Sequence, residues 1–300
     1  MSACSQFDAI MGIDMEPDVG SFTPCWEGVR RGTPGLLGVL ARHGIQATFF
    51  WTADAAENNP SVFKRVQKEG HEVGCHGYAH ESLGEPLFWM PNSWPLLPEE
   101  VEGRIRRATQ ILRRMSGTRP VSFRCPRAWG STKVMSVLEK LGYVADASLP
   151  MYYYRKRFAP YHPSARDWTR PGRMKIVEIP NFCDLAMKSQ DPVYQRDRDQ
   201  WPILRTRSAQ ALLARVDSFR RFVRRRGHRP VVCFYFHPWE FWPMPTGPIR
   251  FSEGTVRPLS FITKNCGPKA LEQFDRLCRG LVERGARFRT ARDVARDFKE

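Results

Sequence analysis

Apolar runs separated by helical patterns are the feature of this sequence that most restricts its fold. Three of these runs are residues 7–13, 45–51 and 230–236. Runs that are apolar on both faces are typical of central strands in a parallel sheet. Helical patterns lie between them, for example at residues 33–42 and 60–69. The alternation predicts right-handed β–α–β units around one parallel sheet, and it favours a single α/β barrel over two small domains.

The carboxyl ends of four expected strands carry side chains suited to catalysis. They are Asp14 and Glu16 after residues 7–13, His76 and His80 after residues 72–75, Arg124 after residues 120–123, and His237 after residues 230–236. Parallel α/β proteins place their chemistry at this end of the strands. Because side chains alternate along a strand, Asp14 and Glu16 face the same side. The strand ends together predict one shared site, although each residue alone would also fit an ordinary turn or loop.

His76 and His80 are spaced as metal ligands often are. On a helical turn, residues four apart share a face, so both imidazoles would reach one point. Neutral imidazole nitrogen is a preferred ligand of zinc and related divalent metals. The alternative for an isolated pair is two loop histidines that hydrogen-bond to backbone or water. The acids expected at the neighbouring strand end favour the metal site.

This ordered set of motifs resembles the polysaccharide deacetylase family, the NodB-homology domain of carbohydrate esterase family four. The matching stretches are Asp14-Met15-Glu16, His76-Gly-Tyr-Ala-His80, Arg124-Cys125-Pro126 with Trp129 close behind, and Phe236-His237, and the resemblance runs from about residue 7 to 290. The usual adjacent acids are spread to Asp-x-Glu, a spacing found in a divergent branch, and this leaves either Glu16 or Asp18 to complete a metal site. The resemblance implies a distorted (β/α)7-type barrel. We expect one catalytic domain over residues 1–300, with rim insertions near 81–97, 150–199 and 240–266.

The resemblance implies a role for each residue that matches a family motif. Glu16, His76 and His80 would hold one divalent metal, with zinc expected and cobalt, nickel or iron as alternatives. Asp14 would act as general base, Arg124 would keep it ionised, and His237 would protonate the departing amine. Asp146, at the end of another expected strand, either orients His237 or caps the next turn.

The resemblance implies a hydrolase that removes an acetyl or formyl group from the nitrogen of an amino sugar. We expect this sugar to be a biosynthetic or lipid-linked intermediate. Four tryptophans near the motifs are expected to contact this substrate: Trp89, Trp94, Trp129 and Trp239. Two alternatives share the fold. One is hydrolysis of a non-sugar C–N bond, as in allantoin or a cyclic imide, and the other is a non-catalytic barrel that binds carbohydrate.

Composition restricts the partners and the compartment. The formal net charge is +16, and a basic helix expected at residues 208–226 suggests a solvated face, with peripheral contact to anionic lipid as an alternative. Nucleic acid is an unfavoured partner because no aromatic-interleaved basic motif is present. The eight cysteines form no C-x-x-C pair, and no signal peptide or transmembrane run is visible, so we expect a cytoplasmic protein. The oligomeric state is not predicted.

Overall fold

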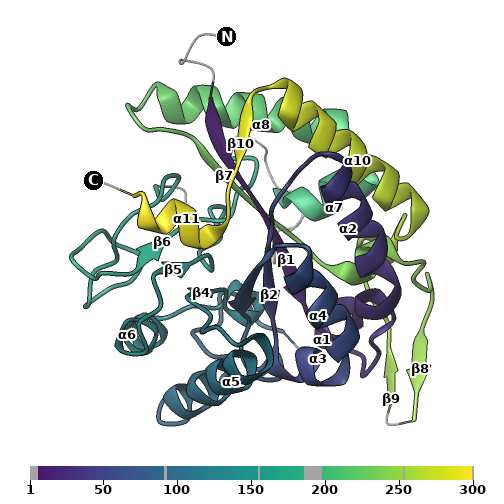
Figure 1. Ribbon diagram of the computed structural model, residues 1–300, viewed down its shortest axis with the longest axis horizontal. Helices are drawn as coiled ribbons and strands as arrows, with labels where there is room; N and C mark the ends of the chain where they lie inside the picture. The colour runs from purple at the N-terminus through teal and green to yellow at the C-terminus, as the bar shows by residue number, and fades with distance from the viewer. Residues whose placement is uncertain (1–5, 91–92, 155, 186–197, 253, 299–300) are drawn as a thin grey trace.

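Eight strands form the centre of the computed structural model, which describes residues 6–90, 93–154, 156–185, 198–252 and 254–298 (Figure 1). They are β1 (Phe7–Met15), β2 (Thr48–Trp51), β3 (Glu72–Cys75), β4 (Ser122–Phe123), β5 (Ala145–Asp146), β6 (Val177–Glu178), β7 (Val231–Phe236) and β10 (Ala286–Phe288). The order is β10-β1-β2-β3-β4-β5-β6, and β7 pairs with β1. All these pairs are parallel.

The sheet curves back on itself. The register of β7 on β1 overlaps those of both β10 and β2, so β7 must occupy the opposite edge of β1. Beyond β6, a parallel bridge between Asn181 and Cys233 returns the sheet to β7. This closure confirms the predicted distorted (β/α)7-type barrel. Every residue of β1 is buried, as expected for a strand covered on both faces.

Helices surround this sheet (Figure 1). They are α1 (Asp18–Ser21), α2 (Thr33–Arg42), α3 (Ala53–Asn58), α4 (Pro60–Lys68), α5 (Val101–Ser116), α6 (Thr132–Lys140), α7 (Gln200–Thr206), α8 (Ala209–Arg224), α9 (Ser260–Thr263), α10 (Pro268–Glu283) and α11 (Ala291–Arg296). Helix α5 shows why they pack: its buried residues include Val101, Ile105, Ala108 and Leu112, which form one apolar stripe. Gly117 then ends the helix in the left-handed conformation.

The starts of two helices have features that the sequence patterns did not indicate. A π-helical turn at Gly28–Gly32 runs directly into α2, so Thr33 is itself helical. Helix α3 was not predicted. Its start carries a recognisable signal, since the side chain of Thr52 accepts a hydrogen bond from the backbone N–H of Ala55.

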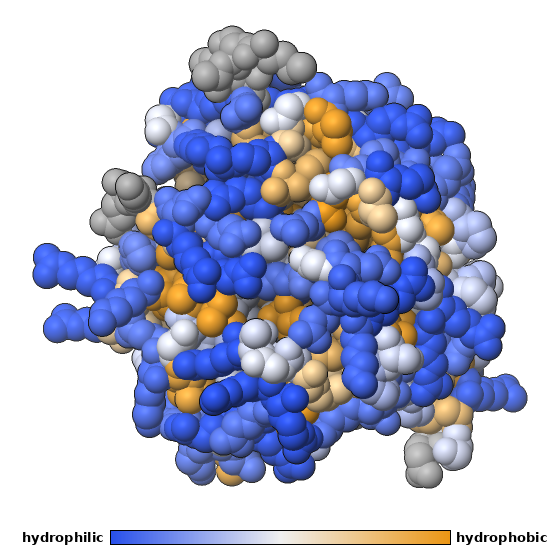
Figure 2. Space-filling view, in the orientation of Figure 1, coloured by the Kyte–Doolittle hydropathy of each residue, from blue (hydrophilic) through white to orange (hydrophobic). Residues whose placement is uncertain are grey.

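One of the three rim insertions contains regular structure that the sequence did not indicate. The third includes a hairpin of β8 (Ile249–Phe251) and β9 (Gly254–Val256), followed by α9. Residues 186–197 of the second lie outside the described residues. The face in Figure 2 is mainly hydrophilic, with smaller apolar patches between the charged side chains. Among the described helices, none has both the length and the apolar character that crossing a membrane requires.

Candidate active site

Glu16, His76 and His80 converge at the carboxyl ends of β1 and β3. Glu16 Oε2 lies 2.5 Å from His80 Nε2 and 3.5 Å from His76 Nε2. All three side chains are buried. The segment from His76 to His80 is an irregular loop, so the predicted helical turn is wrong. Instead Gly77 and His80 take positive φ angles of 83° and 57°, which fold the loop so that both rings face Glu16.

The hydrogen bonding of this cluster fits a divalent cation. His76 Nδ1 lies 2.7 Å from the carbonyl oxygen of Arg124, which assigns its proton to Nδ1 and leaves a lone pair on Nε2. Within the described part of the chain, His76 Nε2 and His80 Nδ1 have no hydrogen-bond partner. One ligand atom from each of Glu16, His76 and His80 lies within 4.8 Å of the other two. Two imidazoles and a carboxylate are a donor set typical of zinc and related metals.

The protonation states also suit metal binding, which requires proton-free ligands. Burial lowers the pKa of His80 to about 4, although Glu16 opposes this shift, so His80 is neutral at pH 7. Burial alone would raise the pKa of Glu16. The interactions of Glu16 with His80, His237 and His76 outweigh burial and hold its pKa well below the usual range.

Asp18, the alternative acidic ligand, points elsewhere. Its two carboxylate oxygens accept hydrogen bonds from the backbone N–H groups of Glu27 and Gly28, at 3.0 and 2.9 Å. Burial raises its pKa to about 7 in spite of these bonds. The geometry therefore favours Glu16 over Asp18 as the acid beside the histidine pair.

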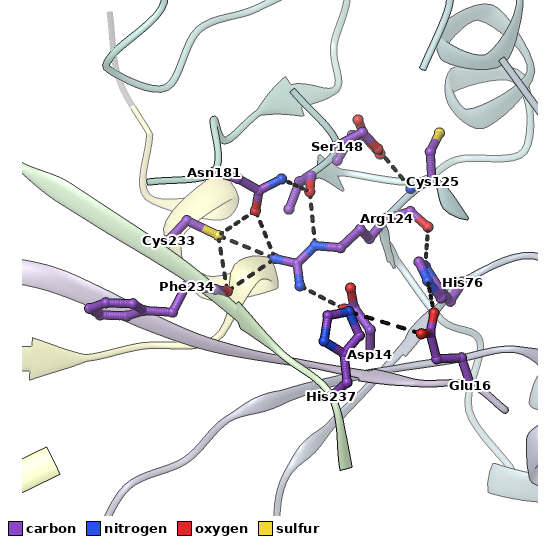
Figure 3. A network of polar contacts seen from close by, with 12 residues as sticks. Asp14, Glu16, His76, Arg124, Cys125, Ser148, Asn181, Cys233, Phe234 and His237 are labelled. Atoms are coloured by element: carbon purple, nitrogen blue, oxygen red, sulfur yellow. Dashed lines mark hydrogen bonds and ion pairs between the residues drawn. The ribbon is translucent and has the colours of Figure 1, made fainter. Parts of the chain in front are cut away.

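Asp14 and Arg124 form a buried ion pair beside this cluster (Figure 3). Arg124 Nη1 donates to Asp14 Oδ1 at 2.7 Å, and Arg124 Nε donates to the carbonyl oxygen of Ala147 at 2.9 Å. Its Nη2 donates to Asn181 Oδ1 at 3.1 Å. The guanidinium lies over Gly12, where an added Cβ would stand only 2.5 Å from Nη1. The small residue on β1 thus provides the space for the arginine that holds Asp14.

His237 follows β7 and lies on the other side of Glu16. Its Nδ1 is 3.0 Å from Glu240 Oε1, and its Nε2 is 4.0 Å from Glu16 Oε1. Burial would lower the pKa of His237, but the carboxylates of Glu16, Glu240 and Asp14 outweigh burial and raise it.

Of the two alternatives for Asp146, the hydrogen bonding does not support contact with His237. Asp146 Oδ1 instead accepts a hydrogen bond from Ser148 Oγ at 2.7 Å, and Ser148 Oγ in turn accepts one from the backbone N–H of Cys125 at 2.8 Å. The carboxylate that meets His237 comes from Glu240, three residues further along the same loop.

The four tryptophans divide into two pairs. Trp129 has no exposed surface and packs against Phe88, so it cannot stack on a sugar as expected. Trp239 is also buried: its ring stacks on that of His237 at 5.0 Å, and its Nε1 lies 3.4 Å from Glu16 Oε1. Trp89 and Trp94 are 70% and 80% exposed, so both are accessible to a ligand.

The converging side chains line one narrow cavity of about 60 Å³. Its wall contains Asp14, Glu16, His76, His80, Arg124 and His237, joined by residues that sequence patterns did not single out, including Asn181, Tyr235, Arg127 and Trp201. A larger hollow of about 890 Å³ opens near Asp8 and Arg287, at the amino ends of the strands. We assign the chemistry to the smaller cavity because the acid, base and metal-type ligands meet only there among the described residues.

Comparisons with known proteins agree with this architecture. A family model for polysaccharide deacetylases matches residues 19–145. A peptidoglycan deacetylase-like protein of Gibberella zeae is 29% identical over 166 residues, 50% of this chain and 46% of that protein. A chitooligosaccharide deacetylase of Azorhizobium caulinodans is 32% identical over 111 residues, 37% of this chain and 48% of that protein. The chain thus spans about half the length of these curated relatives. Over these stretches the chain is similar to the polysaccharide deacetylase family.

Solved structures support the fold over nearly the whole chain. An allantoinase has a TM-score of 0.61 at 14% identity, with 97% of this chain and 89% of that chain covered. A carbohydrate esterase family 4 pseudoenzyme from Bacillus anthracis has a TM-score of 0.53 at 13% identity, with 97% and 66% covered. At these identities the likeness concerns the fold alone. The matched range includes His76, His80 and Arg124 but not Asp14, Glu16 or His237, so the assignment of those three rests on the geometry described above.

Proposed function

We propose that this chain is a metal-dependent hydrolase that removes a small N-acyl group from an amino sugar. The observation that carries the proposal is the meeting of three kinds of group in one cavity: the Glu16–His76–His80 cluster, the Asp14–Arg124 ion pair and His237. Amide hydrolysis needs a polarised carbonyl, a base for water and an acid for the departing amine. The names of the matched relatives, which include peptidoglycan and chitooligosaccharide deacetylases, favour an N-acetylated sugar.

Glu16, His76 and His80 would hold one divalent cation. We propose zinc, with cobalt, nickel and iron as the alternatives that a metal analysis must separate. A bound cation of this kind polarises a carbonyl group and lowers the pKa of water. The bond from His76 Nδ1 to the carbonyl oxygen of Arg124 fixes the ring so that Nε2 faces the cluster.

Asp14 takes the proton from the attacking water in this proposal. Arg124 donates to Oδ1 of Asp14, and among the described residues no hydrogen bond reaches Oδ2, which leaves that oxygen for water. The bond from Arg124 to Oδ1 fixes the orientation of the Asp14 carboxylate, with Oδ2 free to accept the proton of a water molecule. The further bonds of Arg124 to Ala147 and Asn181 prevent the pair from swinging out of the cavity.

His237 gives its proton to the departing nitrogen. Its Nδ1 is engaged by Glu240 and its Nε2 lies near Glu16 Oε1, so Nε2 is the atom that faces the reacting group. The neighbouring carboxylates raise its pKa, which favours the protonated ring that a general acid needs.

The size of the cavity favours a short acyl group. A volume of about 60 Å³ holds only a few water molecules, which suits formyl or acetyl better than a long acyl chain. The exposed Trp89 and Trp94 would contact the sugar outside the cavity. We assign the whole chain, residues 1–300, to one catalytic domain. Anionic lipid contact through the basic final turn of α8, with Arg221 and Arg224, is a secondary proposal that would suit a lipid-linked substrate.

A substrate panel tests the proposal. The zinc-supplied protein would be given N-acetylated chitooligosaccharides, an N-formylated amino sugar and allantoin, and the release of acetate, formate or ring-opened product measured. Acid release from a sugar supports the proposal. Turnover of allantoin alone would favour the non-sugar hydrolase, an alternative suggested by the fold of the allantoinase. No turnover with metal bound would favour a non-catalytic barrel that binds carbohydrate. The Bacillus anthracis pseudoenzyme has a similar fold.

A further inference from the structure

Glu240 holds His237 through two hydrogen bonds to one carboxylate oxygen. Glu240 Oε1 accepts the backbone N–H of His237 at 2.9 Å and lies 3.0 Å from Nδ1 of the same residue. A carboxylate beside Nδ1 assigns the proton to that nitrogen. Glu240 is completely buried, so solvent does not compete for these bonds.

Arg205 donates a hydrogen bond to the second carboxylate oxygen of Glu240. Arg205 Nε donates to Glu240 Oε2 at 2.8 Å, and neither side chain has exposed surface. The other nitrogens of Arg205 donate to backbone oxygens of the third rim insertion, including that of Ile262 at 2.8 Å. The backbone N–H of Gly267, just beyond this insertion, donates to the carbonyl oxygen of Glu240 at 2.8 Å. The carboxylate is therefore fixed from both sides.

Aromatic rings restrict the imidazole further. Trp239 stacks on the His237 ring with centroids 5.0 Å apart and planes at 21°. Trp201 and Tyr235 meet the same ring edge-on, at 5.7 and 5.8 Å. With one face covered and edges contacted, the ring can turn only if the Glu240 bond to Nδ1 breaks.

We propose that Glu240, itself held by Arg205, is a positioning residue that keeps Nδ1 of His237 protonated and directs Nε2 at the leaving nitrogen. The catalytic part of this inference rests on the proposed hydrolase function. When the C–N bond breaks, its electron pair stays on nitrogen and the proton of His237 Nε2 passes to that nitrogen. The imidazole is left neutral with its proton on Nδ1, the tautomer that Glu240 stabilises. The third rim insertion thereby supports His237 through Arg205 and Glu240.

Leaving-group dependence separates this role from a structural one. An aryl oxide departs without a proton, whereas an amine requires one. We expect Glu240→Gln to lower kcat for an N-acetylated chitooligosaccharide by about 100-fold, since that is the scale of general acid catalysis. Turnover of 4-nitrophenyl acetate should stay nearly unchanged. Arg205→Lys, which keeps the charge but not the fork of hydrogen bonds, should give a smaller loss on the amide alone.

Glu72→Gln is the matched control. Glu72 is also buried and accepts hydrogen bonds from Thr48 and Ser122, but it lies at the start of β3, away from the site. This control should leave the ratio of amide to ester turnover at its wild-type value. Equal loss of both activities in Glu240→Gln would overturn the positioning role and indicate general damage to the fold.

Nitrogen NMR of histidine-labelled protein tests the positioning without any substrate. We expect His237 to show a single form with Nδ1 protonated, and Glu240→Gln or Arg205→Lys to produce a mixture of tautomers. An unchanged His237 signal in both variants would refute the inference whatever the activity. A changed signal in a protein that hydrolyses none of the amides would leave the positioning intact and reject the proposed function.

Discussion

Arg124 Nη1 donates a hydrogen bond to Asp14 Oδ1 at 2.7 Å, although the two residues are 110 positions apart in the sequence. Both are almost completely buried. Burying opposite charges is costly unless each is fully hydrogen-bonded, and Arg124 meets this condition through Ala147 and Asn181. The pair is therefore both a candidate catalytic device and a structural one.

Removing the arginine should destabilise the fold strongly. Arg124→Met leaves the carboxylate of Asp14 buried without a cation, and we expect the free energy of unfolding to fall by about 3–5 kcal/mol. Denaturant unfolding measures this directly. Arg65→Met is the control, because Arg65 pairs with Glu69 on the surface and is half exposed; its loss should cost at most about 1 kcal/mol. Equal effects of the two substitutions would contradict the account.

Gly12 should tolerate no side chain. In Gly12→Ala the added Cβ would stand 2.5 Å from Arg124 Nη1 and 2.6 Å from the carbonyl oxygen of Phe234, and the backbone oxygen cannot move away. We expect a loss of about 1–3 kcal/mol in unfolding free energy from the overpacking, with loss of activity. Gly103→Ala, inside α5 with no atom within 4 Å of the new Cβ, should instead stabilise by up to about 1 kcal/mol. A neutral Gly12→Ala would show that the guanidinium is free to shift.

The buried acids Asp146 and Glu178 should make stability depend on pH. They are paired residues of β5 and β6 with no exposed surface. Burial raises the pKa of Asp146, and burial together with the neighbouring Asp146 raises that of Glu178 well above its usual range. The folded protein therefore retains a proton that the unfolded chain releases above about pH 4, so this contribution to stability falls as pH rises.

Glu178→Gln tests that pH dependence. The amide oxygen can still accept the backbone N–H of Leu149, which donates to Oε1 in the wild type at 2.9 Å. We expect the variant to gain stability relative to the wild type between pH 5 and pH 8, by up to about 1.4 kcal/mol per pH unit for one proton. Chemical denaturation at several pH values measures the difference. A difference that is flat, or that falls with pH, would show that both acids ionise freely in the fold.

The exposed tryptophans should affect substrate binding more than turnover. In Trp89→Ala and Trp94→Ala we expect KM for a chitooligosaccharide to rise severalfold, equivalent to about 1 kcal/mol for a lost aromatic contact, with kcat nearly unchanged. Val282→Ala on α10 is an exposed apolar control away from the motifs. Unchanged KM in both tryptophan variants would remove them from the substrate site.

The sequence was sufficient to predict the barrel and several of the residues that line the cavity. Apolar runs indicate strands that are buried on both faces. Because the carboxyl ends of parallel strands meet at one edge of a sheet, Asp14, Arg124 and His237 could be placed together without coordinates. The local geometry of His76 and His80 could not be predicted in this way. Their spacing suggests a helical turn. The positive φ angles of Gly77 and His80 instead produce a loop, which also brings both imidazole rings to one point.

The partner of His237 illustrates why contacts are harder to predict than strand ends. Asp146 has the expected place at a strand end, but Ser148 and Glu178 are closer to its carboxylate and engage it. Glu240 follows in the same short turn as His237 and reaches back to it. A glutamate three residues after the histidine is a visible signal. The sequence does not show that Arg205, 35 residues earlier, completes the contact.

Metal content and acid release, measured on the same samples, decide whether this chain is a metal-dependent deacetylase. The wild type and Asp14→Asn would be loaded with zinc, freed of excess metal and assayed with an N-acetylated chitooligosaccharide. We expect one zinc per chain in both proteins and acetate release by the wild type alone, because Asp14 is a base outside the ligand cluster. Failure of the wild type to retain any divalent metal, or full activity of Asp14→Asn, would contradict this expectation.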